Sequence, residues 1–425
     1  MAEIKPFRGL LYSSEKIGGD YSTVMAPPYD VISDKERDEL YKKNEYNIIR
    51  LILGKSFETN GETDNKYTRA GKMLAEWQKE GILAKDDKRS FYVCRQEYEH
   101  EGTILKRLGF IGLMEISDDV LPHEHTLAKP KKDRMELIKQ VKSNLSPIFS
   151  LYEDEDGKIS DILEKGISKS DPLIDVKADG VRHMVWKFSD EQGVEEISRF
   201  MNKKKTFIAD GHHRYEVARL YRDLCRQDEA YTGRADHIMM YFTDLNDTDN
   251  LTVVATHRVI KEMPRKDKAD TIKKLKEYFD AETCDDMDSL SGRLKEHVGT
   301  DNVFGYIDDN GYLFFKPKNV EALLSLITEE RSPEWKKMDV SVLHSAVFSK
   351  ILSVNSGEGN ITYVKTPEEA EALVKDQSHQ AAFLLNPTRV AQLKAVAEKG
   401  EMMPQKSTYF YPKLLSGPVI NKFGE

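Results

Sequence analysis

The residues with the clearest chemical potential lie in the stretch FIADGHHRYEVARL, which begins at Phe207. The KTFIAD that leads into it is rich in β-branched and aromatic residues and predicts a strand. Apolar residues then recur at helical spacing, so we expect a helix that begins near the two histidines. Between strand and helix stand one glycine and four groups able to bind an anion or move a proton: Asp210, Gly211, His212, His213 and Arg214.

This predicted turn has the features of an anion site. Gly211 permits a tight turn or a close backbone approach. A helix N-terminus offers unpaired amides and a partial positive charge, and Arg214 adds a two-pronged donor for phosphate or carboxylate. His212 or His213 could donate a hydrogen bond or move a proton near neutral pH. Asp210 would orient a histidine, hold a magnesium ion or act as a base, although it could also simply cap the helix.

A second polar cluster, PHEHTLAKPKKDR, precedes a helix that we expect to start near Asp133. Cations just before a helix N-terminus suit phosphate, so a phosphate-contacting loop is the favoured interpretation for Lys129, Lys131 and Arg134. In an extended chain His123 and His125 would point to the same side, as in a metal pair, but no third ligand is evident. His123 is therefore placed among the phosphate-binding candidates, and Glu124 among the catalytic ones.

Three further residues are candidates for binding the substrate. Asp30 follows two prolines in APPYDVIS, where a rigid loop could hold a functional carboxylate or merely anchor a turn. Arg50 stands in YNIIRLILG, which we interpret as a buried strand; it would pair with a carboxylate such as Asp30 or reach into the site. His257 lies in the predicted strand LTVVATHRVI beside Arg258, with a core salt bridge as the alternative.

The elements that must position these residues indicate an α/β protein with mixed sheets, in three stretches: 1–115, 116–260 and 261–425. In the first, Ser33 and Glu36 form a capping box for a helix. The second stretch contains both the histidine motif and the PHEHTLAKPKKDR cluster. In the third, the turn DNG predicts a hairpin, and strands then alternate with helices in the βαβ manner. A chain of 425 residues is too long for one ordinary core.

Composition narrows the partners and the compartment. The formal net charge of −9 argues against duplex nucleic acid. The three cysteines are far apart, which suits a reducing cytoplasm, and no apolar run is long enough for a membrane helix. The start lacks the apolar core of a signal peptide. We therefore expect a cytoplasmic protein with small-molecule partners, as a monomer or a homodimer.

The blocks APPYDVIS, YNIIRL, PHEHTLAKPKKDR, NLSPIFSLY and KSTYFYPK, together with the histidine motif, resemble the bacterial family DUF1015 over essentially the whole chain. The DGHHR core is also similar to the DGHTR-type element of free serine kinases in the ParB/sulfiredoxin-like superfamily, with His213 in place of their threonine. This resemblance implies a ParB/sulfiredoxin-like core over residues 116–260 with flanking α/β regions. It also implies that the helix after the motif binds nucleotide phosphates.

The sequence thus predicts a phosphotransferase that acts on a small hydroxyl compound, with serine or phosphoserine first, ATP or ADP as the nucleotide, and Mg²⁺. The absence of a P-loop pattern is compatible with this, because phosphoryl transfer chiefly needs positioned positive groups. A phosphoserine phosphatase and a nucleotide-binding regulatory protein without turnover are the alternatives. The sequence leaves open which carboxylate is the base.

Overall fold

The computed structural model describes residues 3–58, 61–202, 204–264, 268–299, 302–354 and 359–424. The chain forms two compact units. Unit 1 comprises residues 1–121, 126–252 and 412–425, and unit 2 comprises residues 122–125 and 253–411. The predicted boundary near residue 260 lies close to Thr252, where the chain passes from unit 1 to unit 2. The other predicted boundary, at residue 115, does not separate two units, because the large sheet of unit 1 has strands on both sides of it. The expected mixed α/β class is confirmed.

Unit 1 is built around a nine-stranded mixed sheet of order β6-β11-β8-β12-β5-β4-β10-β9, with β1 paired to β5. Its strands are β1 (Ile4–Lys5), β4 (Phe91–His100), β5 (Thr103–Glu115), β6 (Val120–Leu121), β8 (Ile148–Tyr152), β9 (Ile174–Ala178), β10 (Val181–Phe188), β11 (Thr206–Asp210) and β12 (His237–Asp244). Two small pairs join β2 (Leu10–Tyr12) to β3 (Leu83–Lys85) and β7 (Ser143–Asn144) to β21 (Asn421–Lys422).

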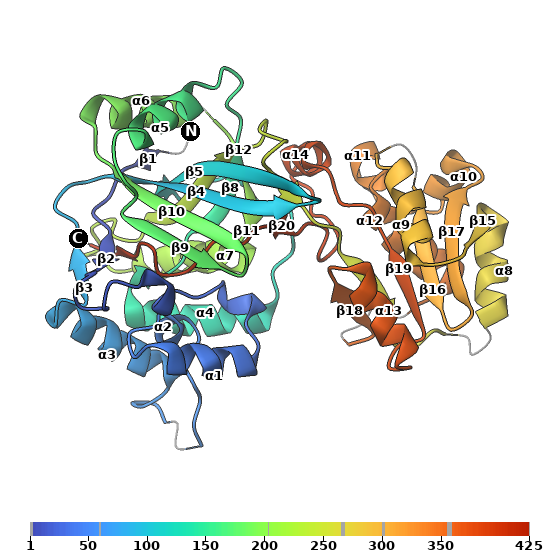
Figure 1. Cartoon of the computed structure of the whole chain (residues 1–425), viewed down its shortest axis with the longest axis horizontal. Coiled ribbons are helices and arrows are strands. Elements are labelled where there is room, and N and C mark those ends of the chain that lie inside the picture. The colour runs from blue at the N-terminus through green and yellow to red at the C-terminus, as the bar shows by residue number, and fades with distance from the viewer. Residues whose placement is uncertain are drawn as a thin grey trace. The chain divides into compact units, whose positions relative to one another are not determined.

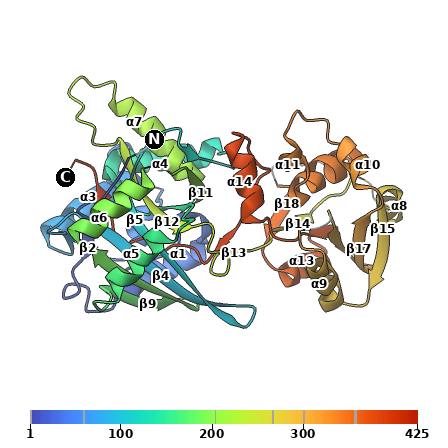
Figure 2. The ribbon, with the colours of Figure 1, turned by 90° about the horizontal axis from the view of Figure 1, so that it is seen from above.

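Helices cover both faces of this sheet. Figure 1 shows α5 and α6 on one side and α1 to α4 on the other, and Figure 2 shows α7 beside α4. The helices are α1 (Asp34–Lys43), α2 (Ile49–Ile52), α3 (Lys66–Lys79), α4 (Ala128–Val141), α5 (Lys158–Ile167), α6 (Glu191–Met201) and α7 (His212–Cys225), with 3-10 turns η1 (Tyr21–Thr23) and η2 (Tyr29–Val31). None of the described helices is long and apolar enough to cross a bilayer.

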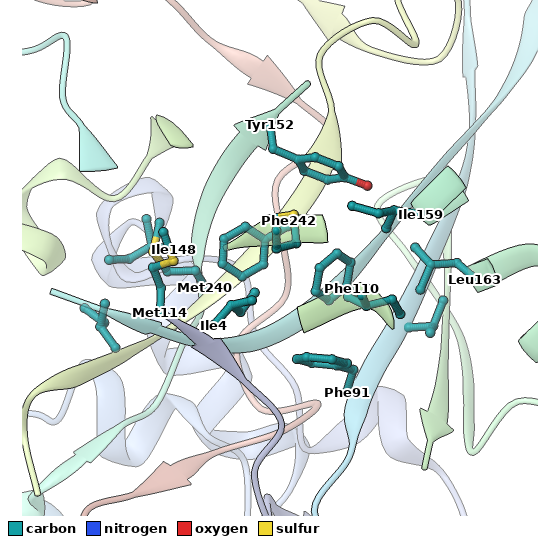
Figure 3. Close-up of a cluster of buried hydrophobic side chains, with 14 of the residues drawn as sticks. Ile4, Phe91, Phe110, Met114, Ile148, Tyr152, Ile159, Leu163, Met240 and Phe242 are labelled. Atoms are coloured by element: carbon teal, nitrogen blue, oxygen red, sulfur yellow. The ribbon is translucent and has the colours of Figure 1, made fainter. Parts of the chain in front are cut away.

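Aromatic rings from neighbouring strands hold α5 and α6 against the sheet (Figure 3). Phe110 on β5 stacks on Phe242 with ring centroids 5.3 Å apart, and meets Phe91 edge-on at 5.2 Å. Ile159 and Leu163 of α5 belong to the same buried cluster. Ile208 of β11 belongs to this cluster as well, so the apolar core helps to fix the end of the strand on which Asp210 stands.

Two features of unit 1 bear on the sequence predictions. The capping box is confirmed, because the Ser33 hydroxyl accepts from the Glu36 amide and the Glu36 carboxylate accepts from the Ser33 amide at 2.7 Å. YNIIRLILG is not a strand, since Ile49–Ile52 is the short helix α2. The side chain of Asn47 fixes its start by accepting from the Ile49 amide at 2.9 Å. Strand and helix are hard to tell apart in so short an apolar run.

Unit 2 contains an antiparallel sheet of order β15-β17-β16-β19-β14-β18. The strands are β14 (His257–Ile260), β15 (Phe279–Cys284), β16 (Phe304–Asp308), β17 (Gly311–Pro317), β18 (Ile361–Val364) and β19 (Ala381–Leu384). The helices are α8 (Lys268–Tyr278), α9 (Met287–Glu296), α10 (Val320–Ser325), α11 (Pro333–Lys336), α12 (Asp339–Ser341), the π-helix η3 (Val342–Leu352), α13 (Pro367–Lys375) and α14 (Val390–Glu398). Two short strands remain, β13 (Thr252–Val253) and β20 (Phe410–Tyr411).

The expected DNG hairpin is confirmed as β16–β17. The βαβ pattern of β18, α13 and β19 is also present, but β14 lies between the two strands and pairs antiparallel with both. The predicted strand LTVVATHRVI is in fact two strands, β13 and β14, separated by three residues without regular structure.

Close packing between β5 and β12 predicts that Gly109 tolerates no larger residue. A Cβ at Gly109 would lie 2.3 Å from the Phe242 carbonyl oxygen. We expect Gly109→Ala to lower the free energy of unfolding of unit 1 by about 2–3 kcal/mol. Urea unfolding in a Trp335→Phe background checks this, because the remaining tryptophans, Trp77 and Trp186, both belong to unit 1.

Gly61→Ala is the matched control, because an added Cβ there meets nothing within 4 Å. Its effect should stay within about 0.5 kcal/mol. Equal effects of the two substitutions would contradict the packing argument.

Candidate functional site

The predicted strand, turn and helix around the histidine motif are present as β11, Gly211 and α7. Gly211 is the residue before the helix and has φ +98°, in the left-handed region that favours glycine. A Cβ at this position would also lie 2.9 Å from the guanidinium of Arg214. The glycine therefore allows the backbone to turn and Arg214 to fold back over the turn.

Asp210, the last residue of β11, is held between two cations. Its carboxylate accepts from Arg214 at 2.9 Å and from Lys413 of the C-terminal segment at 2.5 Å. Burial raises the pKa of Asp210, but Lys413 and Arg214 outweigh it and hold the pKa well below its usual range. Asp210 therefore stays ionised and is a weak proton acceptor, better suited to positioning the two cations than to acting as a base.

The two histidines differ in environment. His212 is buried, and burial lowers its pKa to about 3 although Asp210 acts in the opposite direction, so the ring is neutral at pH 7. His213 is half-buried, and its Nε2 accepts a hydrogen bond of 2.9 Å from the backbone amide of Leu127. Leu127 is the residue before α4, so this bond joins the first turns of α4 and α7.

The N-terminal turns of α4 and α7 both lack acidic residues. The first turn of α4 instead carries Lys129, which is exposed, and Lys131 follows it, half-buried. Within the described ranges neither lysine side chain has a hydrogen-bond or ion-pair partner. A cation at a helix N-terminus opposes the helix dipole by about 0.3–1 kcal/mol, so two such turns together favour a bound anion.

The helix α4 starts at Ala128, earlier than the expected start near Asp133. Pro130 lies in its first turn, where the missing amide of proline costs no helical hydrogen bond. As a consequence Arg134 lies inside the helix and not in a loop before it.

Arg134 is buried and contributes to a wall of the site. Its guanidinium bonds to Asp133 and to the Ile52 carbonyl oxygen at 2.8 Å, and lies 4.0 Å from the centroid of the Tyr29 ring. Burial opposes ionisation of Asp133, but Arg134, Lys66 and Tyr67 lower its pKa to about 2. This network fixes Arg134 through charge and stacking at once.

A pocket opens beside these groups within unit 1 and encloses about 530 Å³ of space, its open mouth included. Arg134 and Arg214 supply positive charge, and Ser143, Asn144 and Ser146 supply hydroxyl and amide groups. Its other lining residues are largely apolar: Tyr29, Ile52, Leu137, Ile138, Val141, Leu145, Ile148, Val217 and Ile238. An apolar cavity with a few convergent polar groups is typical of a small-molecule site.

Two of the predicted substrate-binding residues belong to unit 1. Asp30 is exposed and follows Tyr29, whose ring lines the pocket. Arg50 donates to the Tyr41 carbonyl oxygen at 2.8 Å, and its guanidinium lies 4.5 Å from the centroid of the Tyr41 ring. The guanidinium of Arg50 therefore contacts a carbonyl oxygen and an aromatic ring, and not the carboxylate that we expected as its partner.

Three other predicted residues belong to unit 2. His123 is buried, with Nε2 2.9 Å from the Thr408 hydroxyl. The Glu124 carboxylate accepts from the backbone amide of Lys406 at 3.2 Å. His257 is buried in β14 and accepts from the Leu385 amide, and burial followed by the charge of Arg258 lowers its pKa to about 4.

No group of three or more metal-ligating side chains is present among the residues that the structure describes. The residue that sequence reasoning missed is Lys413. It is the last residue of the block KSTYFYPK, and 203 positions separate it from Asp210. Tyr29 and Ser146, each beside or within a quoted block, were missed as well.

The chain belongs to the family described as protein of unknown function DUF1015, whose model matches residues 4–341. No curated protein matches the chain. The fold is similar to a conserved hypothetical protein from Pyrococcus furiosus at 15% identity and a TM-score of 0.34, over 70% of this chain and 89% of that one.

Two free serine kinase structures cover 73% of this chain and 90% of theirs. One, a variant in complex with ADP, has 15% identity and a TM-score of 0.38; the other, in complex with AMP, has 14% and 0.36. Likeness at this level carries no argument about activity. The relation to the ParB/sulfiredoxin-like superfamily stays a prediction from the DGHHR motif.

The largely buried ion pair of Asp210 and Lys413, whose side chains are 16% and 13% exposed, predicts strong energetic coupling between them. We expect Lys413→Met to lower the free energy of unfolding by about 2–3 kcal/mol at pH 7, because it leaves part of a buried charge unpaired. Adding Asp210→Asn should cost less than the sum of the two single changes, with a coupling of about 1–3 kcal/mol. The depressed pKa makes this stabilisation present above about pH 4 and lost as the pH falls further.

The matched control is the exposed pair of Asp175 and Arg182, whose side chains are 39% and 49% exposed. The same cycle there should give no more than about 1 kcal/mol. Urea unfolding in the Trp335→Phe background measures both cycles, and equal couplings would contradict the buried-pair assignment.

The lowered pKa of His212 predicts that its ring stays neutral from pH 8 to pH 5. The unfolded chain takes up this proton near pH 6.5, so the contribution of His212 to stability falls as the pH drops below about 6.5. Nitrogen NMR of ¹⁵N-histidine-labelled protein, with His212→Gln for assignment, checks the prediction. The urea-unfolded protein is the control, and a folded-state midpoint near 6.5 would refute the burial argument.

Proposed function

We propose that this protein transfers a phosphoryl group between a nucleotide and a small hydroxyl compound, with serine or phosphoserine as the first candidate. The observation that carries the proposal is the junction of two helix N-termini, joined by the hydrogen bond from Leu127 to His213. Both first turns are free of acidic residues, and one adjoins the pocket that Arg134 and Arg214 line. Phosphoryl transfer depends mainly on such positioning and on stabilisation of negative charge.

In this proposal the first turn of α7 holds a phosphate group. Its backbone amides and the guanidinium of Arg214 donate hydrogen bonds to the phosphate oxygens. Lys129 and Lys131 of α4 neutralise the remaining charge. Asp210 keeps Arg214 in place through the 2.9 Å ion pair, and the neutral ring of His212 donates or accepts a hydrogen bond without adding charge.

The base that accepts the hydroxyl proton is then a carboxylate other than Asp210, because the pKa of Asp210 is held too low. Glu124 keeps this role as a prediction, and Asp30 offers an exposed carboxylate beside the pocket wall. His123, His257 and Arg50 stay predictions as contacts to phosphate or substrate.

The proposal includes Mg²⁺, which a protein commonly binds through one or two carboxylates together with the phosphates of the nucleotide. Asp30 fits this requirement, whereas both oxygens of Asp210 already accept from cations. When bound, the ion neutralises charge on the phosphates and so favours transfer.

The test is a phosphorus NMR assay of the purified full chain with Mg²⁺. Phosphoserine is supplied with AMP, ADP or no nucleotide, and serine with ATP or ADP. Arg214→Gln should lower kcat/KM for nucleotide-dependent transfer by about 100-fold or more, because it removes a charged donor to the phosphate. Arg219→Gln on the same helix is the matched control, since Arg219 is exposed and pairs with Glu216, and it should stay within about twofold.

Three results would contradict the proposal. Free phosphate released from phosphoserine without nucleotide would identify a phosphatase. Nucleotide binding without turnover in any mixture would identify a binding protein. Equal losses for Arg214→Gln and Arg219→Gln would show that the turn of α7 does not contact the phosphate.

A further inference from the structure

A second pocket of unit 1 lies among elements that the proposed function does not use. It encloses about 920 Å³ of space, its open mouth included. Residues near the start of the chain, the loop between α7 and β12, and the C-terminal segment surround it. The lining residues are Lys5, Pro6, Phe7, Arg8, Arg89, Leu113, Thr232, Gly233, Arg234, His237, Asn421, Lys422, Phe423 and Gly424.

Among the residues that the structure describes, the lining holds five lysine or arginine side chains and one histidine, and none of the described lining residues carries a carboxylate. The pocket wall is therefore positively charged, whereas the whole chain has a formal net charge of −9. Cations that share a concave surface repel one another, and the low-dielectric wall strengthens the field between them. Without an anion this arrangement is unfavourable.

Two of these cations donate hydrogen bonds to uncharged acceptors. Arg8 donates to the Asp86 carbonyl oxygen at 2.7 Å and Lys422 to the Gln78 side chain at 3.0 Å, and both acceptors are uncharged. Over the part of the chain that the structure describes, none of the five lysine and arginine side chains in the lining forms an ion pair with a carboxylate.

Two carboxylates close in sequence to the lining have partners other than its five lysine and arginine side chains. Glu3 accepts from His237 at 3.4 Å, and Asp236 pairs with Arg226 at 2.9 Å. Burial and the charge of Lys5 lower the pKa of His237 although Glu3 acts in the opposite direction. The positive charge of Lys5 therefore disfavours protonation of His237, another residue of the same lining.

This pocket is separate from the one beside Asp210, and the two share no lining residue. Asp210 and Tyr241 both lie opposite Phe149 in the large sheet, and His237 precedes Tyr241 by four residues on β12. Four residues along a strand and two strands across place His237 about 16 Å from Asp210 between Cα atoms. A ligand of the first pocket therefore does not explain the second.

We propose that this basic pocket binds a small anion that carries several phosphate charges. Three of the cations are arginines, and their planar donors match phosphate oxygens in pairs. A ligand with three or more negative charges offsets the five cations better than a single carboxylate does. The Thr232 hydroxyl adds a neutral hydrogen-bonding group to the same wall.

The test uses isothermal titration calorimetry with sodium tripolyphosphate as the probe and sodium citrate as a second arm. The double variant Arg89→Ala/Arg234→Ala removes two exposed cations of the lining. The double variant Arg199→Ala/Arg331→Ala is the matched control, because both arginines are exposed and lie outside both pockets. Thermal unfolding verifies that each variant folds.

The titrations are made in an Arg214→Gln background, which weakens binding at the first turn of α7. There we expect one tripolyphosphate per chain, with affinity lowered at least tenfold by the pocket substitutions and within twofold of the background with the control substitutions. Affinity should also fall with added salt. Absence of binding at millimolar concentration, or equal losses in the two double variants, would overturn the proposal. So would binding that wild type shows and the Arg214→Gln background loses, which would place the anion at the first turn of α7, or citrate binding as tightly as tripolyphosphate, which would exclude recognition of phosphate.

Discussion

The ion pairs of Asp210 are the interaction on which the arrangement of unit 1 depends. One buried carboxylate joins the end of β11, the first turn of α7 through Arg214, and the C-terminal segment through Lys413. The same segment is anchored at neighbouring positions, because the carbonyl oxygens of Pro412 and Lys413 accept from buried Arg107 and from Gln96. A buried charge with a missing partner is costly, so the carboxylate selects the conformation in which all three segments meet.

The surroundings of this pair are rich in positive groups, although the whole chain has a formal net charge of −9. The helix dipoles of α4 and α7 meet through Leu127 and His213, and the cations nearby are positioned by groups that leave their charge only partly neutralised. Arg134 is satisfied by Asp133, a carbonyl oxygen and the ring of Tyr29. Under the proposed function, a bound phosphate would relieve the repulsion among these positive groups and so stabilise the folded protein.

Local patterns in the sequence were sufficient to predict the strand, glycine turn and helix around the histidine motif, because each depends on residues a few positions apart. The capping box and the DNG hairpin are confirmed for the same reason. The strand predicted for YNIIRLILG is wrong, because the four residues of α2 are too few to show a helical periodicity. Lys413 could not be found this way, because its contact with Asp210 is set by tertiary packing within unit 1 between segments that are 203 positions apart in the sequence.

The order of the segments along the chain has a consequence for biosynthesis. Unit 1 is interrupted after Thr252 and resumes only at Pro412, with most of unit 2 between them. A ribosome delivers the N-terminal part first, so β11 and α7 emerge with Asp210 still lacking its lysine, and unit 2 can fold before unit 1 is complete. Until Lys413 and β21 are synthesised, the nascent unit 1 therefore exposes a carboxylate without its lysine and a β7 without its partner strand, and chaperone protection matters most in this interval.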